Sequence, residues 1–282
     1  MTAKASTDAG ALLGRQHHEL GALATLGAGS AAIALSCGGA AKTYEHTEPN
    51  EDAAFFFRGP GGWLLAVADG HHGSTGSEAV IDYIAANLAD DWTGGASLGF
   101  DTQSWLQCAE GILFDCGRAV LRRAAERGVG PAPTTLCLAL VRPSESALSW
   151  ICIGDSHLFR SGPKGIDDLG WASLGREDRY FLGYEAASRQ GMAGRSVSGY
   201  RDLDDTHALV LATDGLSEIG IGVPNPARAV ADSLKSSENS AADHFALETV
   251  KHLGETTMGA HVKNRAGDNI ALAALDLRHG AS

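Results

Sequence analysis

The sequence contains no run of about 18 uninterrupted apolar residues, the length that a membrane-spanning helix requires. Its first ten residues, MTAKASTDAG, lack the apolar stretch of a signal peptide. Lys and Arg number 22 against 34 Asp and Glu, which gives a formal net charge of −12, and no Lys/Arg-rich run concentrates positive charge. These absences argue against a membrane protein, an exported protein and a nucleic-acid-binding protein, so we expect a cytoplasmic location.

Cysteine is scarce as well. The five cysteines are widely spaced and form no CxxC pair, so the sequence predicts neither a disulfide framework nor a zinc site. A chain of 282 residues can bury a sizeable core without such crosslinks.

Short apolar segments alternate with helical patterns along the chain. Strands are predicted at 31–37, 53–58, 63–69, 134–141, 147–154, 157–160, 207–213 and 269–277, and helices at 74–90, at 104–127 and twice within 226–253. Short connections favour antiparallel sheets with helices on their outer faces, which is an α+β class. We expect an N-terminal arm over 1–29 and a single domain over 30–282, with a patternless insertion at 161–207.

Acidic residues recur where these predicted strands begin or end. A carboxylate at the end of a buried strand is costly unless it is paired or holds a cation. Each Asp-Gly or Gly-Asp-Ser step alone is a common turn, but the turn reading does not explain the repetition. If the strand ends converge, an all-oxygen cluster results that suits Mg²⁺ or Mn²⁺ better than zinc. The residues are Asp69, Asp155, Asp214, Asp268 and the pair Glu51-Asp52.

The ordered set of these segments resembles the metal-dependent protein phosphatase 2C family. The resemblance covers about residues 50–275 and implies a four-layer α-β-β-α sandwich with two antiparallel sheets, flanked by helices, and a binuclear metal site at one edge. It also implies hydrolysis of phosphoserine and phosphothreonine in proteins. The segments are NEDA (50–53), VADGHHG (67–73), TTL (134–136), IGDSHLFR (153–160), LATDGLSE (211–218) and GDNIALAAL (267–275).

The resemblance also implies individual roles. Asp69 corresponds to a carboxylate that bridges two metal ions, and Gly70 to a backbone carbonyl ligand. Asp214 and Asp268 correspond to the remaining ligands. Glu51 and Asp52 correspond to acids that hold metal-bound water, Asp155 to a residue that with Asp214 supports a weaker third ion, and His71 to a general acid.

The chemistry expected of such a cluster follows from charge. Carboxylates repel a phosphate dianion, so two Mg²⁺ or Mn²⁺ ions must first reverse the local sign, and a water shared by the two ions can attack phosphorus directly. A serine or threonine alkoxide leaves poorly, so His71 would assist by protonating it.

Two positions depart from the family pattern. Thr47 stands where the family usually has a phosphate-binding arginine, with His46 and Lys42 nearby, and His157 replaces the arginine of GDSR. An arginine of the insertion could instead lend a cation: Arg176, Arg179, Arg189 or Arg195.

We expect a monomeric Ser/Thr phosphatase that acts on a phosphoprotein, with no nucleic-acid or membrane partner. Two alternatives remain open, namely a catalytically weak phosphatase-like binding or regulatory protein and a phosphatase for small phosphorylated metabolites.

Overall fold

Two antiparallel sheets face each other in the computed structural model, which describes residues 8–170, 180–184, 192 and 194–278. In spatial order, the first sheet contains β1 (Asp8–Leu13), β4 (Ala53–Gly59), β5 (Gly62–Ala68), β6 (Leu136–Arg142), β7 (Ala147–Ile153) and β10 (Ser196–Asp202). The second contains β2 (Ala24–Ala28), β3 (Ala31–Ser36), β12 (Ile270–Asp276), β11 (Ala208–Ala212), β8 (His157–Gly162) and β9 (Gly165–Asp168).

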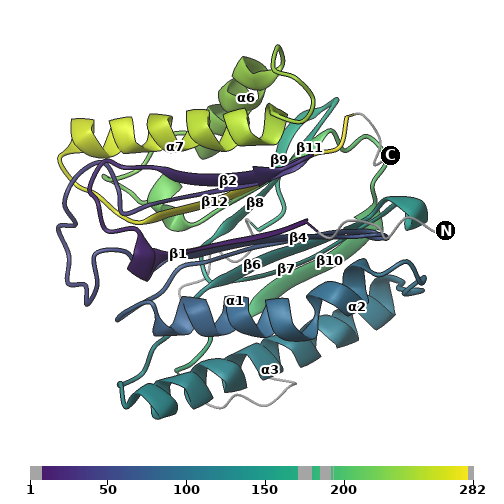
Figure 1. Cartoon of the computed structure of the whole chain (residues 1–282), viewed down its shortest axis with the longest axis horizontal. Helices are drawn as coiled ribbons and strands as arrows, with labels where there is room; N and C mark the ends of the chain where they lie inside the picture. The colour runs from purple at the N-terminus through teal and green to yellow at the C-terminus, as the bar shows by residue number, and fades with distance from the viewer. Residues whose placement is uncertain (1–7, 171–179, 185–191, 193, 279–282) are drawn as a thin grey trace.

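Helices cover the outer face of each sheet (Figure 1). The first sheet carries α1 (Thr75–Asn87), α2 (Ala89–Thr93) and α3 (Thr102–Arg127), and the second carries α6 (Pro226–Ser237) and α7 (Phe245–Asn264). Three short 3₁₀ turns complete the described elements: η1 (Gly14–Gln16), η2 (Pro143–Glu145) and η3 (Asp214–Leu216). The predicted four-layer α-β-β-α sandwich is therefore confirmed. No helix in the described ranges combines the length and apolar character needed to cross a membrane.

Strand β5 shows why the layers form. All seven of its residues are buried, and their side chains alternate between the two faces of the sheet. Trp63, Leu65 and Val67 join the cluster between the sheets, whereas Leu64 and Ala66 join the cluster beneath the helices. Two apolar faces on one strand require a layer on each side.

The N-terminal segment differs from the expected arm. Within 1–29, β1 pairs with β4 and β2 pairs with β3, so the described part of this segment supplies an edge strand to each sheet. Edge strands are short and face solvent on one side, and DAGALL and ATLGA therefore lack the apolar runs that identify central strands.

The expected patternless insertion at 161–207 also contains regular structure. The end of β8 and strand β9 form a hairpin, and β10 forms the far edge of the first sheet. The sequences GIDD and SVSGYRD are polar because both strands lie at sheet edges. Residues 171–179, 185–191 and 193 of this insertion, with Arg176, Arg179 and Arg189, lie outside the described residues.

A close backbone contact fixes the turn after β11 and can be tested. A Cβ atom at Gly215 would lie 1.8 Å from the carbonyl oxygen of Asn269, a backbone atom that cannot rotate away. We expect Gly215→Ala to lower the free energy of unfolding by about 2–3 kcal/mol.

Gly111→Ala is the matched control, because a Cβ there meets nothing within 4 Å and the position lies inside α3. Better helix propensity should raise stability by up to about 1 kcal/mol. Urea unfolding measures both values, and equal changes in the two variants would contradict the contact at Gly215.

Candidate metal centre

Three aspartates from separate turns meet between the sheets. Asp69 follows β5, Asp155 lies in the turn between β7 and β8, and Asp214 begins η3 after β11. One carboxylate oxygen from each lies within 4.8 Å of the other two. The predicted convergence of strand ends is therefore observed for these three residues, although they are far apart in sequence.

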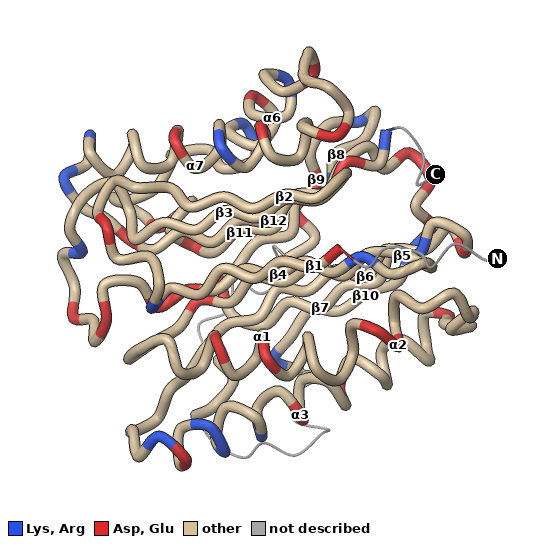
Figure 2. The backbone as a smooth tube through the Cα atoms, in the orientation of Figure 1, with Lys and Arg blue, Asp and Glu red and all other residues tan. Residues whose placement is uncertain are grey.

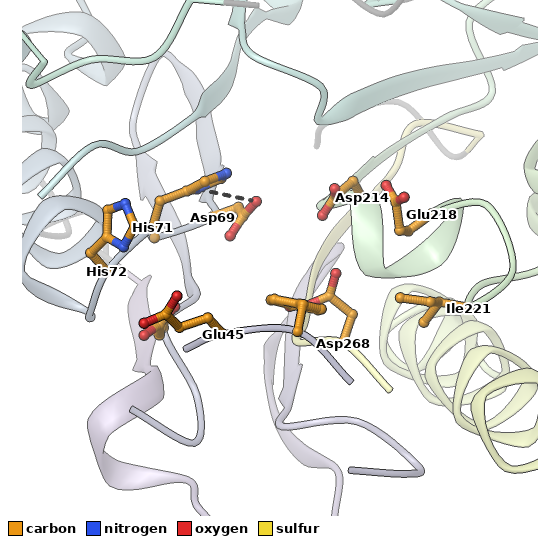
Figure 3. Close-up of a pocket in the computed structure, with 11 residues that line it drawn as sticks. Glu45, Asp69, His71, His72, Asp214, Glu218, Ile221 and Asp268 are labelled. Atoms are coloured by element: carbon orange, nitrogen blue, oxygen red, sulfur yellow. Dashed lines mark hydrogen bonds and ion pairs between the residues drawn. The ribbon is translucent and has the colours of Figure 1, made fainter. Parts of the chain in front are cut away.

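A cavity of about 340 Å³ opens beside this cluster. Asp69 and Asp214 face each other across it, and Asp268 lies below Asp214 in the view of Figure 3, on a third segment. The structure thus places Asp268 in the same cavity but outside the group of three close oxygens. The lining residues are Tyr44, Glu45, Glu51, Asp69, Gly70, His71, His72, Asp214, Glu218, Ile221 and Asp268.

Hydrogen bonds hold the backbone of Asp69. Its N–H donates to Thr135 Oγ1 at 2.9 Å, and its carbonyl oxygen accepts from Thr134 Oγ1 at 2.7 Å and from Thr135 N at 2.9 Å. Gly70 is required next, because a Cβ there would lie 2.4 Å from the carbonyl oxygen of Glu51. The TTL segment therefore serves to fix the position of Asp69.

Asn269 performs the same task for the acids on the other strands. Its Oδ1 accepts from the backbone N–H of Glu51 at 2.8 Å, and its Nδ2 donates to the carbonyl oxygen of Pro49 at 2.9 Å. The neighbouring Asp268 accepts a close hydrogen bond from the Tyr44 hydroxyl. Burial and the Asp268 charge raise the pKa of Tyr44, so the phenol stays protonated and can donate.

Asp52 is buried behind the cavity. Its Oδ2 accepts from Thr213 Oγ1 at 2.7 Å, whereas its Oδ1 has no hydrogen-bond partner in the described part of the chain. Burial, together with the charge of Asp268, raises the pKa of Asp52 to about 7. A buried carboxylate oxygen without a partner suggests a position for water or a hydrated cation.

The acids destabilise one another's charged forms. Burial is the main cause that raises the pKa of Asp69, and the charge of Asp52 adds to it. The pKa of Asp214 is raised by burial and then by Asp268. Figure 2 shows acidic segments between the sheets, away from the termini, and the described lining includes no Lys or Arg.

The nearest lysine is committed to another role. Lys42 Nζ lies 3.8 Å from Glu51 Oε2, and the lysine side chain is only 5% exposed. Glu51 Oε1 accepts from the backbone N–H of Thr47 and of Glu48, each at 2.9 Å. His46 is exposed and its Nδ1 donates to the Tyr44 carbonyl oxygen. In this structure, neither Lys42 nor His46 lines the cavity as a replacement for the family's arginine.

Arg195 is the one described member of the four candidate arginines in the insertion, and it packs elsewhere. Its guanidinium lies 4.2 Å from the centroid of the Tyr180 ring, in a cation–π contact, and Arg195 is not among the residues that line the cavity. The insertion therefore contributes no arginine to the cavity within the described residues.

His71 lies at the wall of the cavity. Its Nδ1 is 3.8 Å from Asp69 Oδ2, a contact marked by the dashed line in Figure 3, and its ring centroid is 4.5 Å from that of Phe181. Its backbone N–H donates to the Pro133 carbonyl oxygen at 2.8 Å. Burial lowers the pKa of His71 despite the carboxylates around it.

The sequence reasoning missed five residues that line the cavity: Tyr44, Glu45, His72, Glu218 and Ile221. Two of them were signalled by their positions in the sequence, because His72 lies next to His71 and Glu218 lies four residues after Asp214. Tyr44 reaches Asp268 across 224 positions, a contact that no local pattern reveals.

Comparisons with known proteins agree with this architecture. No curated protein sequence matches the chain. Among solved structures, a serine-threonine phosphatase 2C from Toxoplasma gondii has 16% identity and a TM-score of 0.61, with 90% of this chain and 99% of that chain covered. Stp1 from Staphylococcus aureus has 18% identity and a TM-score of 0.59, with 92% and 97% covered.

The catalytic domain of PstP, a serine threonine protein phosphatase solved in complex with two manganese ions, has 20% identity and a TM-score of 0.59, with 90% and 99% covered. At these identities the structures show a shared fold. The family model for protein phosphatase 2C matches residues 39–264, which is most of the sequence. The chain therefore belongs to the protein phosphatase 2C family.

Proposed function

We propose that this chain is a metal-dependent hydrolase that removes phosphate from phosphoserine and phosphothreonine of proteins. The observation that carries the proposal is the meeting of Asp69, Asp155 and Asp214 beside a cavity whose described lining has no Lys or Arg. Family membership supports the reaction, and the two manganese ions of the distantly similar PstP domain support the choice of metal.

The residues present fit a pair of Mg²⁺ or Mn²⁺ ions. The donors are carboxylate and carbonyl oxygens, which hard divalent cations prefer. The unpartnered Asp52 Oδ1 and the raised pKa values of Asp69 and Asp214 indicate negative charge that the protein itself does not balance. Asp69, the Gly70 carbonyl, Asp214 and Asp268 would hold the ions directly. Glu51 and Asp52 would act through water, and Asp155 with Asp214 would support a weaker third ion.

Two bound divalent cations would lower the pKa of a water molecule and would supply positive charge for the phosphoryl oxygens. The chain's own residues position this chemistry. Thr134 and Thr135 fix the backbone of Asp69, and Tyr44 fixes one oxygen of Asp268 by donating to it. His71 would deliver a proton to the leaving serine or threonine oxygen from its place on the cavity wall.

One observation favours the second candidate, a phosphatase-like protein that binds phosphorylated partners and turns them over poorly. Thr47 supplies no guanidinium, and Lys42 is held by Glu51, so the described cavity lacks a bidentate cation for phosphate. Hydrolysis of p-nitrophenyl phosphate with Mn²⁺, Mg²⁺ or EDTA decides between the two. Metal-dependent turnover supports the enzyme, and Mn²⁺ binding without turnover supports the binding protein.

Asp214→Asn tests the metal assignment. Because a bound metal ion contributes several kcal/mol to the transition state, we expect a loss of turnover of at least about 100-fold, with a parallel loss of Mn²⁺ affinity by calorimetry. The metal-free variant should melt at a higher temperature than the parent, because a buried charge is removed. Asp232→Asn, exposed on α6, is the control and should change neither value. Parent-like turnover in Asp214→Asn would exclude the assignment.

The raised pKa values predict an unusual pH dependence of stability. Above about pH 4 the folded protein retains protons on Asp69, Asp214 and Asp52 that the unfolded chain has lost, so the free energy of unfolding falls as pH rises. The metal-free protein should therefore be more stable at about pH 5.5 than at about pH 7.5. Saturating Mn²⁺ should reduce or reverse this trend, because the ions displace the protons.

Urea unfolding at the two pH values, with and without Mn²⁺, measures the effect. Asp214→Asn removes one of the contributing groups and should show a smaller pH slope when metal-free. A metal-free parent that becomes more stable at the higher pH would contradict the predicted charge repulsion.

His71→Asn tests proton donation to the leaving group. We expect a loss of about 100-fold or more on a phosphoserine peptide, whose alkoxide leaves poorly. The loss on p-nitrophenyl phosphate should be much smaller, since p-nitrophenolate leaves without a proton. His72→Asn is the matched control, because His72 lines the same cavity and asparagine tolerates its φ of 64°. Equal losses on the two substrates in His71→Asn would exclude this role.

A further inference from the structure

A buried histidine outside the cavity forms a hydrogen-bond chain that the proposed function does not use. His157 is 3% exposed, its Nδ1 lies 2.6 Å from Asp168 Oδ2, and its Nε2 lies 2.7 Å from Ser217 Oγ. Because a carboxylate can only accept, Nδ1 donates to Asp168. In the tautomer that carries its proton on Nδ1, Nε2 accepts from the Ser217 hydroxyl, which gives the two hydrogen bonds a defined direction.

The surroundings hold the ring in place. His157 stacks on Phe159 with a centroid distance of 5.0 Å and an interplanar angle of 13°. Asp168 ends the edge strand β9, and its other oxygen accepts from the Gly170 backbone N–H at 2.9 Å. These contacts fix the plane of the ring, and the Asp168 carboxylate favours the tautomer with the proton on Nδ1.

Two members of this hydrogen-bond chain lie close in sequence to two of the clustered acids, His157 at the start of β8 and Ser217 directly after η3. His157 follows Asp155 by two residues, and Ser217 follows Asp214 by three and also lies 3.4 Å from the Asp214 carbonyl oxygen. Asp155 and Asp214 approach within 4.8 Å although their charges repel. The hydrogen bond from Ser217 to His157 therefore joins the two segments where repulsion would separate them.

A serine, a histidine and an aspartate in this order also form the arrangement of a nucleophilic triad. That role does not fit the geometry here, because Asp214 and Glu218 line the cavity while Ser217 and His157 are not among its described lining residues. The three hydrogen-bonded side chains therefore lie where they can position the acids, and they do not contact a substrate in the cavity.

We infer that the Asp168–His157–Ser217 chain is a positioning device that holds Asp214 against Asp155 and so sets the affinity of that side of the centre for a divalent cation. The inference rests on the proposed function, since it requires that these acids bind metal. It assigns a role to His157, which stands in place of the arginine of the family pattern, and to its partners Asp168 and Ser217.

The test compares Mn²⁺ binding to the full chain by calorimetry. Ser217→Ala removes the hydroxyl that joins the two segments and should weaken Mn²⁺ affinity by about 10–100-fold, the loss typical when a hydrogen-bond partner that orients metal-binding groups is removed. Ser217→Thr keeps a hydroxyl and should bind like the parent. Ser236→Ala, which removes an exposed hydroxyl on α6, is the matched control and should also bind like the parent.

A second readout follows the ring itself. Nitrogen-15 NMR of the histidine side chains should show His157 as the Nδ1–H tautomer in the metal-free parent and in Ser217→Thr. His157→Phe keeps the stacking on Phe159 but removes both hydrogen bonds, and it should lose Mn²⁺ affinity to at least the same extent as Ser217→Ala.

The outcomes separate the two proposals. Parent-like affinity in Ser217→Ala would overturn this inference alone, and so would equal losses in Ser217→Ala and Ser217→Thr, because the hydroxyl would then not be the cause. A parent that binds no Mn²⁺ would overturn the proposed function and this inference together.

Discussion

The site depends on one constraint, namely that like-charged carboxylates must be held together where water reaches them poorly. Two unit charges about 4 Å apart repel by about 4 kcal/mol at an effective dielectric constant of about 20. The repulsion is visible in the raised pKa values of Asp69 and Asp214. The apolar cluster between the two sheets opposes it, because separating the acids would require the strands that carry them to separate.

Hydrogen bonds convert this closeness into a defined geometry. The Thr134–Thr135 pair fixes Asp69, Asn269 joins the loops of Glu51 and Asp268, and the Ser217–His157 bond connects the segments of Asp214 and Asp155. Each of these contacts joins segments that different strands deliver to the same edge. The two packed sheets and these hydrogen bonds therefore hold the acidic side chains in fixed positions.

An acidic cavity and a phosphate substrate conflict unless cations intervene. Lys42 is paired with Glu51, and Thr47 provides a backbone N–H and no guanidinium. Phosphate recognition in the proposed enzyme therefore rests on the metal ions to a greater degree than the family pattern with its arginine implies. Because Thr47 replaces the phosphate-binding arginine of the family, a weakly active protein that binds phosphorylated partners stays the second candidate.

The sequence by itself was enough to predict the central strands, because a strand buried on both faces consists mainly of apolar residues. It was also enough to identify the candidate metal-binding acids, because a charged residue at the end of an apolar strand stands out. It missed edge strands β1, β2, β9 and β10, which face solvent on one side and lack that pattern. Only the tertiary structure decided which acids lie closest, that Tyr44 reaches Asp268, and that His157 joins Asp168 to Ser217. These contacts cross up to 224 positions of sequence and arise from sheet packing, which no local periodicity encodes.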